Sequence, residues 1–193
     1  MFQRYLQAIE FVALIQPSLV SYASMGGTPL IYLCDSLARL ALYPGCSNEE
    51  QQSHLDRVQT NQAKMQNWAK HAPMNFQHKF DLVEAERYHV LGKHVEAMDY
   101  YDRAIAGAKE NEFLHEEAIA NEVAARFYLD WGKEKIAQTY LTEAYYGYAR
   151  WGAKAKVKDL EKRYPELLAP IFTHESIFFQ NRETSTQTIS QTI

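Results

Sequence analysis

The chain has 193 residues, of which 47% are apolar, 13% aromatic and 23% charged, and its formal net charge is −4. This composition is typical of one globular domain and excludes a fibrous or wholly disordered chain. The mild negative charge gives no reason to expect nucleic acid or an anionic membrane as a partner.

Proline and glycine divide the N-terminal part into helical segments. Residues 2 to about 23 are expected to form one or two helices, with a break near Pro17. An apolar helix over 30–43 follows and ends at Pro44-Gly45. The first segment has no basic start and no cleavage site of small residues, so we expect no signal peptide and a cytoplasmic location.

A long polar helix is predicted next. Ser47 and Glu50 have the Ser-x-x-Glu spacing of a capping box, in which each side chain satisfies a free amide at the start of a helix. The helix is expected to run from there to about Lys70, where Ala72-Pro73 closes it.

The clearest signal in the sequence is a repeat with a period of 40 residues. Gly-Lys-His-Val-Glu-Ala-Met-Asp-Tyr begins at Gly92, and Gly-Lys-Glu-Lys-Ile-Ala-Gln-Thr-Tyr begins at Gly132. Such a period indicates stacked supersecondary units, here two helical hairpins that each turn at a glycine. The predicted helix pairs are 75–91 with 94–110 and 113–131 with 133–150.

These patterns predict an all-α fold of stacked antiparallel helical hairpins. The expected helical-repeat domain covers 1–170, with regular repeats at 75–111 and 115–151 and a capping helix at 153–163. The remainder, 171–193, is a polar tail rich in Ser, Thr and Gln that we expect to be mostly disordered.

The repeat resembles the tetratricopeptide repeat, in which small residues lie where two helices touch and an aromatic residue lies between them. Ala85, Gly92, Ala97, Tyr101 and Ala104 match that pattern in the first unit, and Ala125, Gly132, Ala137, Leu141 and Ala144 match it in the second. The resemblance implies a right-handed superhelix. The period is longer than the usual ~34 residues, and Asp81 and Glu84 stand where the family has Trp and Leu.

Most of the chain also resembles the helical region of cyanobacterial-type multi-domain signalling kinases. The stretches that carry this resemblance are Asp35–Leu40, Trp68–Phe76, Asp102–Ile105, Phe127–Lys135, Tyr148–Lys156 and Leu160–Pro165. In that family the helical region follows a Ser/Thr kinase domain and an AAA-type ATPase module and precedes sensor domains and a histidine kinase. The resemblance implies a place in a two-component system.

Motifs for catalysis are missing from the sequence. It has no phosphate-binding Gly-x-x-x-x-Gly-Lys-Ser/Thr loop, no His-Arg-Asp and no Asp-Phe-Gly. Cys34 and Cys46 are expected to be reduced thiols, and the histidines have no metal-ligand spacing. We therefore expect no enzymatic activity, no cofactor and no metal.

The candidate functional residues are those that the repeat alignment places on the concave side of the stack, where the first helix of each hairpin lies. They are Lys79, Glu86, His89, Glu122 and Arg126. We expect them to contact a protein partner, either a flanking ATPase or kinase domain or a peptide of a signalling partner. The alternatives are a free-standing adaptor that binds a peptide in this groove and an inactive remnant of such a kinase.

Overall fold

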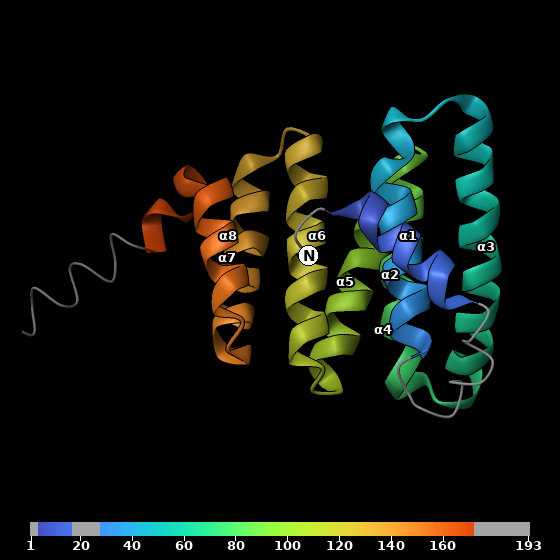
Figure 1. Cartoon of the computed structure of the whole chain (residues 1–193). Coiled ribbons are helices and arrows are strands. Elements are labelled where there is room, and N and C mark those ends of the chain that lie inside the picture. Colours follow the sequence, from blue (N-terminus) through green and yellow to red (C-terminus); the bar gives the residue numbers. More distant parts are fainter. Residues whose placement is uncertain (1–3, 17–27, 172–193) are drawn as a thin grey trace, which may run out of the picture.

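The computed structural model describes residues 4–16 and 28–171, and these ranges contain helices and turns but no strand (Figure 1). The prediction of an all-α fold is therefore confirmed. The helices are α1 (Tyr5–Ile15), α2 (Thr28–Leu42), the short 3-10 helix η3 (Tyr43–Gly45), α3 (Asn48–His71), α4 (Pro73–Val90), α5 (His94–Glu110), α6 (Leu114–Asp130), α7 (Glu134–Trp151) and α8 (Lys154–Arg163). A further helical stretch covers 165–171.

The predicted capping box is present at the start of α3. The Glu50 carboxylate accepts a hydrogen bond from the backbone N–H of Ser47 at 2.8 Å, and the Ser47 hydroxyl accepts one from the N–H of Glu50 at 3.4 Å. α2 begins at Thr28, two residues before the predicted start at 30, because Pro29 is tolerated in a first turn that needs no N–H. The expected break at Pro17 lies outside the described residues.

The repeat folds as two helical hairpins, α4 with α5 and α6 with α7, which lie side by side in Figure 1. Gly92 and Gly132 have φ angles of 71° and 73°, the left-handed conformation that ends a helix at low steric cost. The N–H of Lys93 then donates to the carbonyl of Tyr88 at 2.9 Å, and that of Lys133 to Tyr128 at 2.7 Å. The same closure thus ends the first helix of both hairpins.

Small residues let the two helices of a hairpin approach each other closely. The matched positions are buried: Ala85, Ala97, Tyr101 and Ala104 in the first hairpin, and Ala125, Ala137, Leu141 and Ala144 in the second. At Gly147 an added Cβ would lie 2.9 Å from the Cβ of Ala118, closer than two such carbons approach. The backbones of α6 and α7 therefore leave no room for a side chain there.

Gly147→Val is expected to lower the free energy of unfolding by about 2 kcal/mol, because overpacking costs more than the gain in helix propensity. Urea unfolding followed by circular dichroism measures the change. Ala149→Val, on the exposed face of the same helix, is the matched control. Equal losses in the two variants would contradict close packing at Gly147.

The C-terminal helices close the stack beside α7. Leu160 of α8 and Leu168 of the last helical stretch are fully buried, and the Gln138 side chain donates to the carbonyl of Leu167 at 2.9 Å. The described helix reaches Ile171, which is buried, whereas the rest of the predicted tail, 172–193, lies outside the described residues. Within the described ranges, no helix combines the length and the apolar character needed to cross a membrane.

Candidate functional site

A cleft of about 570 Å³ opens where α2, α4 and α6 approach one another. Tyr5 of α1 and Tyr164, the residue that follows α8, also line it. The polar and aromatic residues that line the cleft are Tyr5, Glu86, His89, Arg126, Asp130 and Tyr164.

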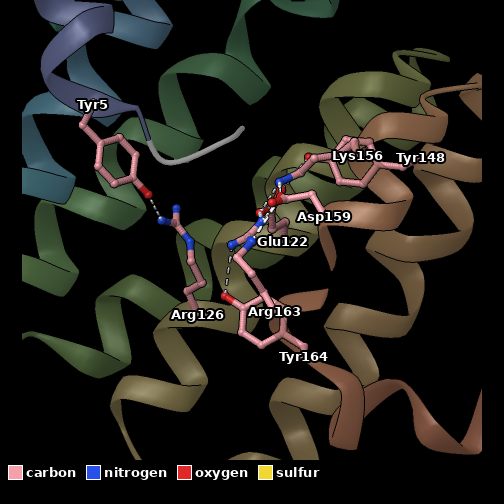
Figure 2. A network of polar contacts seen from close by, with 8 residues as sticks. All are labelled: Tyr5, Glu122, Arg126, Tyr148, Lys156, Asp159, Arg163 and Tyr164. Carbon is pink, nitrogen blue, oxygen red and sulfur yellow. Dashed lines mark hydrogen bonds and ion pairs between the residues drawn. The ribbon is translucent and has the colours of Figure 1, made fainter. Parts of the chain in front are cut away.

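Arg126 of α6 reaches across this cleft toward α1. Its Nη1 donates a hydrogen bond to the hydroxyl of Tyr5, as Figure 2 shows, and its Nε is buried without a partner among residues 4–16 and 28–171. Burial opposes the charge of Arg126, but the carboxylate of Glu86 and, more weakly, that of Glu122 outweigh it and raise the pKa of the guanidinium. The cleft therefore contains a permanent positive charge, and the Nε–H of Arg126 makes no hydrogen bond within the described residues.

Glu86 of α4 lies near Arg126 and is positioned by contacts with Tyr101 and His89. Its Oε1 accepts a hydrogen bond from the buried hydroxyl of Tyr101 and lies 3.6 Å from Nδ1 of His89. Burial raises the pKa of Glu86, but the nearby His89 ring and the charge of Arg126 outweigh burial and lower it. Burial likewise lowers the pKa of His89, and its contact with Glu86 more than offsets this and raises it. His89 also approaches Oδ2 of Asp130 at 3.7 Å, which links α4 to α6.

Glu122 lies one turn before Arg126, in an ion-pair network with the C-terminal helices (Figure 2). Its Oε1 accepts from Nζ of Lys156 at 2.7 Å and from Nη2 of Arg163 at 3.0 Å, and its Oε2 accepts from the Tyr148 hydroxyl at 2.7 Å. Arg163 also donates to the hydroxyl of Tyr164 at 3.4 Å. The network thus fixes α8 against α6 and positions Tyr164 at the cleft.

Lys79 of α4 is also buried, close to the start of α6. Its Nζ lies 2.7 Å from the carboxylate of Glu116 and 4.4 Å from the centre of the Phe113 ring. The same carboxylate contacts Nε2 of His78. Lys79 and His78 therefore connect α4 to the start of α6 through Glu116, inside the protein.

The structure thus brings together Glu86, His89 and Arg126 of the predicted site residues at one cleft, and places Lys79 and Glu122 in buried ion pairs. Sequence analysis missed the other polar residues of the cleft, Tyr5, Asp130 and Tyr164. Helical spacing was a usable signal for Asp130, since residues four apart share a face and Asp130 follows Arg126 by one turn. Tyr5 and Tyr164 lie outside the repeat, and no pattern pointed to them.

Searches against known proteins connect part of the chain to a signalling protein. A stretch of 61 residues is 38% identical to the hybrid signal transduction histidine kinase G of Dictyostelium discoideum. The match covers 32% of this chain and only 2% of that protein, so the chain spans a small part of this curated relative. No family model and no solved structure matches the chain.

The cleft combines a buried carboxylate, Glu86, with the Arg126 guanidinium. The Glu86 carboxylate already accepts a hydrogen bond from Tyr101, and it is almost fully buried. Among the described residues, no group of three His, Cys, Asp or Glu side chains is placed to hold a metal ion. The arrangement can instead present the Arg126 guanidinium to an acceptor group from outside.

Proposed function

We propose that the chain is a non-enzymatic protein-interaction module of the cytoplasm, which couples neighbouring domains of a signalling protein. The observation that carries the proposal is the cleft at Arg126, where one guanidinium with unused donors lies among side chains from α1, α4, α6 and the residue after α8. The partial similarity to a histidine kinase supports a signalling context.

The proposed architecture is a tetratricopeptide-like right-handed stack. Its support is the recurrence of the same helix ending at Gly92 and Gly132 and the burial of the matched small residues in both hairpins. In such a stack each hairpin contacts only its neighbours, so a displacement at one end passes along the packed helices. We infer that the stack transmits a change in one flanking domain to the other.

The cleft is the proposed contact for a flanking domain. A guanidinium offers a planar fork of N–H groups that matches a carboxylate or two backbone carbonyls, whereas a lysine ammonium is a point charge. Tyr5 occupies one position of the Arg126 fork, and in the proposed complex a group of the partner occupies another.

Arg126→Lys is therefore expected to weaken binding of a flanking domain at least tenfold, because charge is kept and the fork is lost. The domains encoded on either side of the chain are purified, and their Kd for the whole chain is measured by isothermal titration calorimetry. Arg150→Lys, at an exposed position near the end of α7, is the matched control and should not change Kd. Urea unfolding of both variants separates lost contacts from lost stability.

The absence of binding by both flanking domains would contradict interdomain coupling. Binding that is equally strong in Arg126→Lys would place the contact elsewhere on the surface. The first outcome tests whether a flanking domain binds the chain at all. The second tests whether the binding takes place at the cleft.

A second candidate function is an adaptor that binds a peptide of a separate protein. The open cleft beside Arg126 favours it, since 570 Å³ is within the range of sites for small ligands and peptide side chains. A peptide library displayed against the whole chain tests this candidate. Selected peptides that bind Arg126→Lys as well as the parent chain would contradict a role for the cleft.

A further inference from the structure

An apolar cavity of about 260 Å³ lies beneath α1, separate from the body of the cleft. α1 and α2 form most of its wall, and Ile119 of α6 completes it. The apolar side chains that line it are Ala8, Leu30, Leu33, Leu37, Ala38 and Ile119.

The inner wall of this cavity offers few hydrogen-bonding groups to water. A buried water needs two to four polar partners, and protein interiors contain few voids larger than one water molecule. Apart from Arg4, the polar side-chain groups of the described wall are a thiol, Cys34, which is a weak hydrogen-bonding group, and the Tyr5 hydroxyl, which already accepts from Arg126. A cavity of about 150 Å³ with an apolar lining is known to bind benzene, so this larger one has room for a longer apolar group.

A single charged residue lies at the edge of the cavity. Arg4 directly precedes α1, lines the cavity and is exposed to solvent. In the part of the chain that the structure describes, no acidic side chain lines the cavity beside it. An apolar space next to one guanidinium is complementary to a molecule with an alkyl body and one negative charge at its end.

We propose that this cavity binds an amphiphile with a medium-length alkyl chain and a terminal carboxylate. The alkyl chain fills the space between α1 and α2, and the carboxylate accepts hydrogen bonds from Arg4. The binding site does not depend on the proposed interaction role.

Tyr5 connects the cavity to the cleft, because its side chain lines both of them. An occupant beneath α1 contacts the same ring whose hydroxyl accepts from Arg126. Occupancy therefore acts on the guanidinium that we assign to partner binding, and this last step alone rests on the proposed function.

The two cysteines supply an assay with an internal control. Cys34 lines the cavity, whereas Cys46 lies after η3 and its thiol donates to the carbonyl of Leu42. The whole chain is treated with N-ethylmaleimide at fixed pH, and mass spectrometry follows each cysteine separately. Decanoate, kept below its micelle-forming concentration, should slow alkylation of Cys34 at least fivefold and leave Cys46 unchanged.

Two pairs of comparisons test the position and the chemistry of the site. Ala8→Leu fills the cavity from α1 and should abolish protection by decanoate, whereas Ala13→Leu, on the exposed face of the same helix, should leave it intact. Arg4→Gln should weaken protection by decanoate about tenfold and leave protection by decanol unchanged.

Three results would overturn the proposal. They are equal protection of Cys34 and Cys46, equal loss of protection in Ala8→Leu and Ala13→Leu, and protection of Cys34 that rises with protein concentration in the absence of decanoate. The last would show that a second copy of the chain covers the cavity. An unchanged response of Arg4→Gln would overturn the assignment of the carboxylate to Arg4. None of these results depends on a flanking domain, so failure here is distinguishable from failure of the proposed interaction role.

Discussion

Asp35→Ala is expected to lower the free energy of unfolding by about 3 kcal/mol, because it removes one partner from a buried ionic cluster. Asp35 is fully buried on α2. Its Oδ1 accepts from Nε of Arg39 at 2.8 Å, and its Oδ2 accepts from Nε of Arg57 at 2.9 Å and from the amide of Asn61 at 2.8 Å. Both arginines are partly exposed and can turn to water, whereas Asn61 cannot, so the loss stays near the lower end of the range for broken buried pairs.

Urea unfolding at pH 7, with the slope compared between variants, measures this effect. Asp56→Ala is the matched control, because Asp56 lies on the exposed side of α3, where its carboxylate accepts a hydrogen bond from the Gln52 amide. The control should change stability by less than about 0.5 kcal/mol, as is usual for surface substitutions. A loss below about 1 kcal/mol for Asp35→Ala would contradict the view that this cluster fastens α2 to α3.

Local patterns predicted the helices well because helix starts and ends depend on nearby residues. The box at Ser47 and Glu50 and the glycines at 92 and 132 act within one turn of the backbone, and each produced the expected ending or start. α2 and α4 each begin two residues before the predicted start, at Thr28 and Pro73, and each has a proline in its first turn, a preference that is also local.

The cleft was only partly predictable, because it depends on contacts between distant segments. The repeat alignment placed Glu86, His89 and Arg126 on one side of the stack, and these residues do meet. It offered nothing on Tyr5, which reaches Arg126 across 121 positions of sequence.

The repeat did contain a signal for the buried charges. The residue 40 positions after Lys79 is Ile119, and the residue 40 positions before Glu122 is Leu82, and both apolar partners are buried. A charged residue whose repeat partner is apolar occupies a position that faces the core. Its charge must then be satisfied by an ion pair, here Glu116 for Lys79 and Lys156 for Glu122, and not by a partner in a groove.

Glu122→Ala should be at least as costly as the change at Asp35, with a loss of about 3–5 kcal/mol, because the groups it leaves behind cannot reach water. Lys156 and Tyr148 are both buried and both donate to Glu122. Lys156 and Arg163 keep their ion pairs with Asp159 in this variant, but both lose their link to α6, so α8 and the contact of Arg163 with Tyr164 at the wall of the cleft should loosen. Urea unfolding measures the stability, and Glu143→Ala, at an exposed position of α7, is the control.

A second variant at this position, Glu122→Gln, is expected to remove part of the acid sensitivity of the fold. Burial raises the pKa of Glu122, but the charge and hydrogen bond of Lys156 and the hydroxyl of Tyr148 outweigh it and lower the pKa in the folded state. A carboxyl with a lowered folded pKa stabilises the protein above its unfolded pKa of about 4.3, and this contribution is lost as the pH falls through the folded value. Between about pH 5 and pH 3, the parent chain should therefore lose stability more steeply than Glu122→Gln. Parallel slopes in that range would show that Lys156 and Tyr148 do not lower the pKa of Glu122 in the folded state.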